Sequence, residues 1–251
     1  MKLAIEELAR LPGVWRGGEL EHAIHETVAT GHAALDRELS GGGWPVGALS
    51  EVLHDGVGIG EVSFLCGALA RAAKEARMIA WINPPHVPYA PALAKAGVPL
   101  ERCTVVEPAH REDALWAAEQ ALRSGACGAV LLWLTHAMPR EARTRADDYA
   151  WLRRLQMAAQ AGRSMAVLFR STAAESLSTP AHLRVVLRAS GNGLELRIPK
   201  RRGPPLVSPI RLDLPGRARK APVERSDFPD SAAVCAPIAI GPSRPLPRIA
   251  A

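Results

Sequence analysis

The sequence has few aromatic residues, no paired cysteines and no long hydrophobic run. Aromatic residues make up only 4% of the 251 positions, so we expect a core built mainly from alanine, leucine and valine. The four cysteines include no CxxC pair, which disfavours a metal site and a disulfide framework and favours buried thiols. The longest apolar run, residues 129–134, is too short to span a bilayer, and the first ten residues carry no secretory signal. We therefore expect a cytoplasmic protein without membrane contact, metal or cofactor.

Most of the chain also lacks an excess of charge of either sign, and the net positive charge lies in one segment. The formal net charge is +6. Residues 200–220 hold seven basic residues and one acidic residue, so this segment carries the whole excess and the charges of the rest of the chain cancel. A basic segment on a neutral body can contact DNA, RNA, an anionic lipid surface or an acidic partner, or it can be a solvated turn, and charge alone does not distinguish these. The candidate contact residues are Lys200, Arg201, Arg202, Arg211, Arg217, Arg219 and Lys220.

Short apolar segments alternate with segments of helical spacing, a pattern typical of an α/β fold with a parallel sheet. Two alternating segments, 182–189 and 193–198, are joined by Ser-Gly-Asn and predict an antiparallel hairpin at one sheet edge. The expected strands are 48–53, 78–82, 103–106, 129–134 and 165–169, and the expected helices are 61–76, 89–96, 112–123 and 141–161.

Regular patterning ends near residue 214. Residues 215–251 contain seven prolines and no periodicity, which predicts an extended tail without a core of its own. Its apolar cluster at 234–240 is either a docking peptide or a segment that covers the chain's own surface. We therefore divide the chain into a lead (1–30), a core domain (31–214) and a flexible tail (215–251).

The stretch from Thr30 to Val62 reads TGHAALDRELSGGGWPVGALSEVLHDGVGIGEV. It resembles the start of the RecA core, in which T-G-x-x-x-L-D-x-x-L-x-x-G-G-x-P-x-G leads into the first strand and a phosphate loop. Several glycines and a proline match at fixed offsets, so the resemblance is specific. It implies a RecA-like parallel sheet flanked by helices, with a C-terminal antiparallel hairpin and a degenerate phosphate loop.

A working phosphate loop reads G-x-x-x-x-G-K-[ST], where the lysine neutralises phosphate oxygens and the hydroxyl binds Mg²⁺. Here Gly56, Gly58 and Gly60 provide the glycines, but Glu61 stands where the lysine belongs and Val62 where the hydroxyl belongs. The family's catalytic glutamate is matched by Pro84 or Pro85, and the strand 129–134 ends without an aspartate. Three separate losses predict a vestigial loop and no catalytic residues.

The combination resembles the ImuA family of SulA-like and RecA-like proteins. The resemblance implies a non-enzymatic adaptor in SOS-induced, error-prone translesion synthesis, a form of DNA repair that follows DNA damage. Its implied partners are an ImuB-like homologue of Y-family polymerases and an error-prone DnaE-type polymerase, with DNA as a further candidate. Two alternatives remain open: a SulA-type cell-division inhibitor that binds FtsZ, and an ATP-binding, DNA-binding protein of the RecA type.

Overall fold

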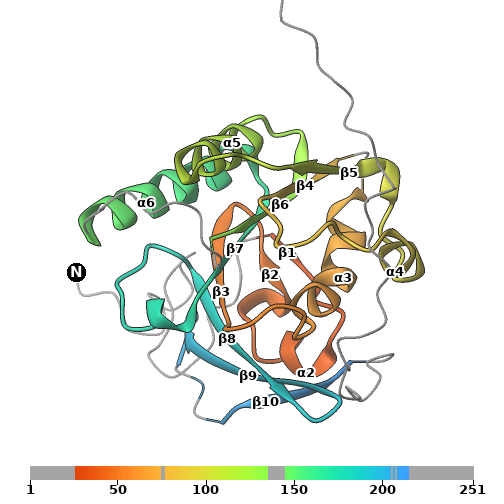
Figure 1. Ribbon diagram of the computed structural model, residues 1–251. Helices are drawn as coiled ribbons and strands as arrows, with labels where there is room; N and C mark the ends of the chain where they lie inside the picture. Colours follow the sequence, from red (N-terminus) through yellow and green to blue (C-terminus); the bar gives the residue numbers. More distant parts are fainter. Residues whose placement is uncertain (1–25, 75–76, 135–144, 205, 207, 215–251) are drawn as a thin grey trace, which may run out of the picture. The chain divides into compact units, whose positions relative to one another are not determined.

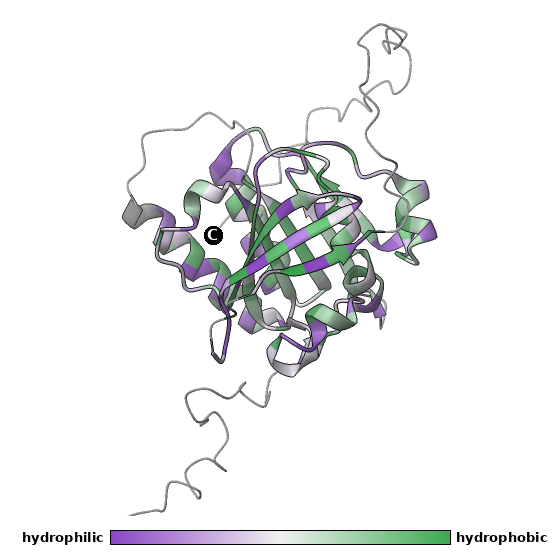
Figure 2. Cartoon of the chain, turned by 90° about the horizontal axis from the view of Figure 1, so that it is seen from below, coloured by the Kyte–Doolittle hydropathy of each residue, from purple (hydrophilic) through white to green (hydrophobic). Residues whose placement is uncertain are grey.

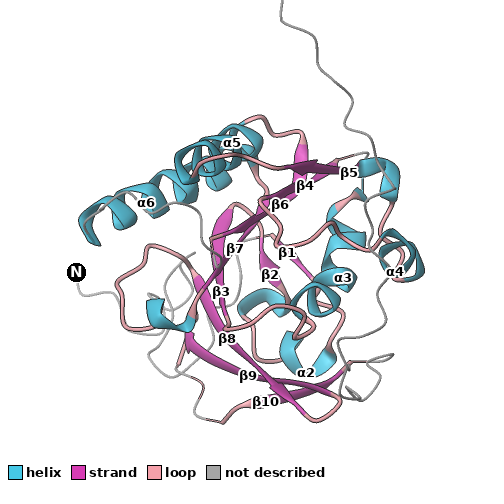
Figure 3. Cartoon of the chain, viewed as in Figure 1, coloured by secondary structure: helices cyan, strands magenta, loops and turns pink. Residues whose placement is uncertain are grey.

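The computed structural model describes residues 26–74, 77–134, 145–204, 206 and 208–214 (Figure 1). Eight strands form one sheet in the order β10-β9-β8-β3-β7-β6-β4-β5 (Figure 3). Their bounds are β3 (Ala48–Leu53), β4 (Met78–Ile82), β5 (Cys103–Val106), β6 (Cys127–Trp133), β7 (Met165–Arg170), β8 (Leu183–Ser190), β9 (Gly193–Lys200) and β10 (Ile210–Asp213).

The sheet is parallel over most of its width and antiparallel at one end. Strand β3 lies between β7 and β8 and runs parallel to both, and β6, β4 and β5 continue the parallel part. Strands β8 and β9 form an antiparallel hairpin, and β10 pairs antiparallel with β9. The predicted α/β class and the C-terminal hairpin are therefore confirmed.

Helices cover both faces of the sheet because its strands present apolar side chains alternately to each side. On one face, Trp81, Trp133 and Phe169 pack in the same cluster as Phe64 and Leu69 of α3. On the other face, strand residues pack against α5 and α6. Figure 1 shows these two helix layers, and Figure 2 shows hydrophobic colour concentrated on the strands between them. The helices are α2 (Ala33–Asp36), α3 (Glu61–Ala72), α4 (Ala90–Lys95), α5 (Arg111–Arg123) and α6 (Arg145–Gly162).

Three strands were not expected as separate elements. A second, two-stranded sheet pairs β1 (Thr27–Val28) antiparallel with β2 (Trp44–Pro45), and β10 extends the large sheet. Short 3-10 turns occupy η1 (Ser40–Gly42), η3 (Leu100–Arg102) and η4 (Thr172–Ala174). Strand β1 places Thr27 and Val28 beside the core, within the lead predicted for residues 1–30.

Some sequence predictions fall outside the described residues. The proline-rich tail at 215–251 and the first turn of the helix predicted over 141–161 are among them. Within the part of the chain that the structure describes, no helix is both long and apolar enough to cross a bilayer.

Candidate functional site: the glycine loop and the basic segment

The glycine loop, residues 54–60, connects β3 to α3 at the carboxyl edge of the parallel strands. Gly56, Gly58 and Gly60 have φ angles of +83°, +73° and +102°, in the left-handed region that glycine adopts without strain. A Cβ atom added to Gly56 or Gly58 would meet nothing within 4 Å. The loop backbone therefore stands in open space, while its last glycine caps α3.

Glu61 is the first residue of α3, and its side chain turns back onto the loop. Its Oε2 accepts a hydrogen bond from the Gly60 backbone N–H at 3.1 Å, and the residue is only 4% exposed. A helix N-terminus attracts anions because its first N–H groups are unpaired and the helix dipole is positive there. In this chain the protein's own carboxylate provides that negative charge, which would repel a phosphate.

Behind the loop, aromatic rings fill the carboxyl edge of the sheet. Trp81 of β4, Trp133 of β6 and Phe169 of β7 stack in a row, with centroid separations of 5.8 and 4.4 Å. His54 meets Phe169 edge-on at 5.8 Å, and the Asn83 amide donates to the Trp133 carbonyl at 2.9 Å. All seven residues of β6 are buried. The strand that would end in a magnesium-binding aspartate therefore ends in a buried tryptophan.

Asp55 ties the glycine loop to the segment that follows β7. Its Oδ1 accepts from the Ser171 hydroxyl at 2.9 Å and the Thr172 N–H at 3.1 Å, and its Oδ2 accepts from the Thr172 hydroxyl. The bond from the Thr172 hydroxyl is the main reason that the pKa of Asp55 lies below its usual value, against a smaller opposing effect of burial. Asp55 therefore fastens the glycine loop to the segment after β7, in addition to the hydrogen bond from Gly60 N–H to Glu61.

The structure places the basic residues of the C-terminal segment differently from one another. The Lys200 ammonium donates to the Thr179 carbonyl at 2.7 Å, and burial together with Arg184 lowers the pKa of Lys200. The Arg201 side chain is 7% exposed and bonds Glu38 Oε2 at 3.0 Å. Arg211 is 80% exposed and lies 3.6 Å from Glu195. Arg217, Arg219 and Lys220 lie outside the described residues.

These placements show that the segment does not act as one exposed patch in its described part. Arg201 is used to fasten the turn after β9 to the region of α2, whereas Arg211 faces solvent on β10. Contact of this segment with DNA or a partner remains a prediction.

Sequence reasoning missed a buried ion cluster in the middle of the sheet. Glu51 of β3 is fully buried, with the Arg170 guanidinium at 2.9 Å and the Arg184 guanidinium at 2.6 Å from its two oxygens. Arg184 lies directly opposite Glu51 on the neighbouring strand and also bonds the Glu175 and Leu177 carbonyls. The available signal was an acidic residue inside an apolar strand, because such a residue is rarely buried without a partner.

No group of three or more histidine, cysteine, aspartate or glutamate side chains within the described ranges could hold a metal ion. Cys66, Cys103 and Cys127 are free thiols, and burial raises the pKa of each. None of these thiols has the lowered pKa that a reactive cysteine requires.

A mostly parallel sheet with a glycine loop between its first long strand and a helix defines an α/β domain of the phosphate-loop type. The family described as the RecA N-terminal domain matches residues 5–175, and the chain belongs to this family.

Individual relatives match shorter stretches. The RecA protein of Chlorobaculum parvum is 32% identical over 137 residues, which cover 53% of this chain and 39% of the relative. The cell division inhibitor SulA of Edwardsiella piscicida is 37% identical over 100 residues, which cover 40% of this chain and 54% of the relative. The chain thus spans less than two thirds of the length of these relatives.

Proposed function

We propose that this chain is a non-catalytic accessory protein of damage-induced, error-prone translesion DNA synthesis, with a RecA-like domain that has lost ATP hydrolysis. The observation that carries the proposal is the Glu61 carboxylate, which is buried and bonded to Gly60 N–H at the start of α3. A triphosphate at this position would meet a fixed negative charge in place of a lysine, and such like-charge contact disfavours binding by several kcal/mol.

The stacked rings of Trp81, Trp133 and Phe169 also support the loss of ATP hydrolysis. Magnesium requires oxygen ligands, and β6 ends in the Trp133 ring where the metal-binding carboxylate would be needed. A site without the lysine, the hydroxyl and the metal-binding carboxylate has no group to position or activate a phosphoryl transfer. The proposed role is therefore that of a binding protein, whose partners would be the ImuB-like polymerase homologue and the DnaE-type polymerase.

Calorimetry with MgATP tests the loss of nucleotide binding. We expect no heat of binding and no turnover from the full chain, with the Chlorobaculum parvum RecA protein as the positive control. Glu61→Gln is the matched variant, since it removes the charge and keeps the side-chain shape. Micromolar binding or steady hydrolysis by the unaltered chain would contradict the proposal.

Co-purification tests the role in translesion synthesis. The full chain should retain an ImuB-like protein, and removal of residues 215–251 should weaken retention. This boundary leaves the β9–β10 pair intact, whereas a deletion from residue 200 would also remove β10. Complete failure of the full chain to retain the polymerase homologue would overturn the proposed pathway.

The match to a SulA protein favours a second candidate, a cell-division inhibitor that acts on FtsZ. A sedimentation assay of FtsZ assembly separates the two functions. Inhibition of assembly at equimolar ratio, without retention of a polymerase homologue, would support the second candidate. Unchanged assembly would leave the translesion role as the better account.

A further inference from the structure

The helix α6 carries three exposed side chains in a row. Tyr149, Arg153 and Met157 follow one another at intervals of four residues, so they lie along one side of the helix. Tyr149 is 41% exposed, Met157 is 59% exposed, and Arg153 is exposed between them. The row is about 12 Å long, because a helix rises about 1.5 Å per residue. We call these three residues the α6 stripe; Figure 1 shows the helix that bears them, with α5 beside it.

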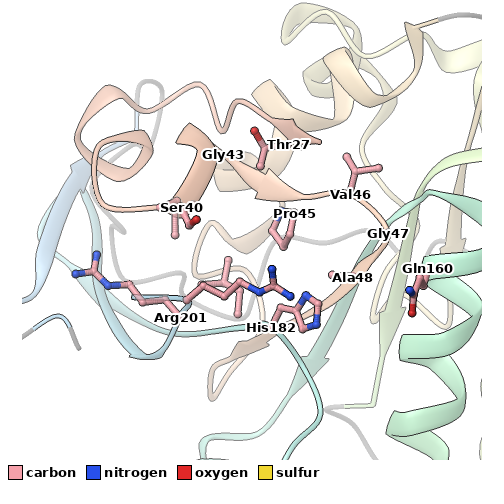
Figure 4. Close-up of a pocket in the computed structure, with 13 residues that line it drawn as sticks. Thr27, Ser40, Gly43, Pro45, Val46, Gly47, Ala48, Gln160, His182 and Arg201 are labelled. Atoms are coloured by element: carbon pink, nitrogen blue, oxygen red, sulfur yellow. The ribbon is translucent and has the colours of Figure 1, made fainter. Parts of the chain in front are cut away.

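The other sides of α6 are packed, so the helix holds the stripe in place. Leu152 and Leu155 are buried in the cluster between α6, α5 and the sheet. Gln156 Oε1 accepts a hydrogen bond from the Leu49 backbone N–H at 2.8 Å, which ties the helix to β3. Beyond the stripe, Gln160 lines a pocket of about 250 Å³ at the amino edge of β3 (Figure 4). A surface that is ordered before binding loses little conformational entropy when it binds.

Two consecutive arginines of α6 differ in what they contact. The Arg154 guanidinium pairs with the Glu119 carboxylate of α5 and lies 4.0 Å from the centre of the Trp151 ring. The Arg153 guanidinium forms no ion pair and no hydrogen bond with any residue that the structure describes. Its N–H donors are therefore available to another molecule.

The contact between α5 and α6 shows what complements an arginine of this helix. Glu119 is buried against Arg154, and Leu115 and Leu122, about one turn to either side of Glu119, are buried in the cluster that also holds α6. On this flank α6 therefore packs against a helix that presents a carboxylate between two apolar side chains. The α6 stripe has the matching order, a cation between two apolar side chains, and no helix among the described residues covers it.

We infer that the α6 stripe binds an amphipathic helix of a protein partner, with a carboxylate of that helix against Arg153 and apolar side chains on Tyr149 and Met157. This inference rests on the proposed accessory function and assigns it a contact surface. Charge complementarity selects an acidic segment, because a guanidinium pairs with a carboxylate through two parallel hydrogen bonds. The spacing selects a helix, because helix residues four apart share one side and match a stripe of the same spacing.

A second copy of the chain fits the stripe less well. Arg153 is its middle residue, so a two-fold contact of stripe on stripe would bring two guanidinium groups together, and like charges repel. Nucleic acid also fits less well. Its phosphate backbone is held by several cations, whereas both neighbours of Arg153 in the stripe are apolar.

Nuclear magnetic resonance titration of the full chain tests the assignment with three probes. The first is the helical peptide acetyl-KALAAAEAAALAAAK-amide, whose glutamate lies midway between two leucines at the spacing of the stripe. The second is its glutamine counterpart, acetyl-KALAAAQAAALAAAK-amide, and the third is a short DNA duplex. We expect the acidic peptide to shift the amide signals of Tyr149, Arg153 and Met157. The glutamine peptide should bind about threefold more weakly, the loss typical of one exposed ion pair.

Three outcomes of this titration would overturn the inference. They are equal affinity of the two peptides, the same signal shifts on addition of the duplex, and concentration-dependent shifts of these signals in the chain alone. The last outcome would identify a second copy as the occupant of the stripe.

Paired variants locate the contact. Arg153→Ala should weaken binding of the acidic peptide by about threefold, whereas Arg188→Ala removes an equal charge from an exposed position of β8 and should change nothing. Met157→Ala should weaken binding by about fivefold through lost apolar contact. Trp116→Ala removes a side chain of the same exposed fraction, 59%, from α5 and should leave the affinity unchanged. If Arg153→Ala binds as the unaltered chain does, or if the two control variants lose as much affinity, the stripe is not the site.

The double variant Arg153→Ala, Met157→Ala separates this inference from the proposed function. It should retain less of the ImuB-like partner than the unaltered chain does. If it retains that partner fully, the assignment of the stripe is wrong and the translesion role stands. If the acidic peptide binds the stripe but the full chain never retains a polymerase homologue, the stripe stands as a helix-binding surface and the translesion role is wrong.

Discussion

The carboxyl edge and the amino edge of β3 differ in what occupies them. At the carboxyl edge the chain fills the space with its own groups, namely the Glu61 carboxylate and the row of Trp81, Trp133 and Phe169. At the amino edge of β3 lies a pocket of about 250 Å³, lined in part by Arg201, whose guanidinium pairs with Glu38. Open parallel sheets usually bind ligands beyond the carboxyl ends of their strands. Here the chain's own side chains occupy the position behind the glycine loop, and pockets lie both at the amino edge of β3 and beside Arg170 at the end of β7.

The carboxyl edge shows how this chain packs the position at which proteins of the phosphate-loop type hold a nucleotide. A bound nucleotide and metal supply charge balance and contacts that the empty site would lack. In this chain Trp133 and Phe169 are fully buried and fill this region with apolar packing, while the Glu61 carboxylate places negative charge at the N-terminus of α3.

The largest effect is expected from removal of the Glu51 carboxylate, which lies between the two edges of β3. Glu51 lies in the middle of β3 and balances Arg170 and Arg184. Glu51→Ala would leave two guanidinium groups buried without their carboxylate, at a cost of about 3–5 kcal/mol. We expect the urea midpoint to fall sharply and the amide signals of both edges to be lost together.

Glu195→Ala is the matched control for this change. Glu195 pairs with the exposed Arg211 on the outer strands, and the loss should stay below about 1 kcal/mol. A loss at Glu51 no larger than the loss at Glu195 would show that the buried cluster does not join the two edges.

Two glycines compare the edges directly. Gly43 lines the pocket at the amino edge of β3, and a Cβ atom there would come within 2.3 Å of the Val28 carbonyl oxygen. Its φ of 176° is extended, so the clash alone should make Gly43→Ala cost about 2–3 kcal/mol, in the upper part of the range for overpacking. Gly56 at the carboxyl edge has open space around it, so Gly56→Ala should cost only about 1 kcal/mol, from its φ of +83°. Thermal unfolding of both variants measures the difference. A reversed order would mean that the amino edge is the more adaptable of the two.

Sequence patterns predicted the parallel sheet, the hairpin and the position of the glycine loop, because these depend on local periodicity and on glycine spacing. They missed β1 and β2, which have two residues each and exist only because Thr27 and Val28 meet the strand Trp44–Pro45 across the chain. The burial of Arg201 was also missed, since its partner Glu38 lies 163 positions away.

The candidate site likewise has features that the sequence predicts and features that only the structure shows. The sequence itself shows that the lysine and the metal-binding carboxylates are absent, so their loss could be stated without a structure. That the Glu61 carboxylate turns back onto Gly60, and that rings from separate strands stack behind the loop, depends on side-chain packing. The pocket at the amino edge of β3 combines residues from seven separate stretches of chain, and no local pattern marks it.

The smallest predicted effect sharpens the comparison at the carboxyl edge, where Asp55 fastens the glycine loop to Ser171 and Thr172. Its pKa is lowered in the folded chain, so the contact stabilises the fold above the unfolded pKa of about 3.9. That contribution is lost as the pH falls through the lower folded pKa. Because Asp55 is exposed to solvent, the stabilisation at pH 7 should stay below about 1 kcal/mol. Asp55→Asn and Thr172→Val should each lower the urea midpoint slightly at pH 7, and the difference from the unaltered chain should shrink toward pH 3. A difference that grows on acidification would have the wrong sign for a carboxylate held by hydroxyl donors, and would mean that the loop is fastened by some other contact.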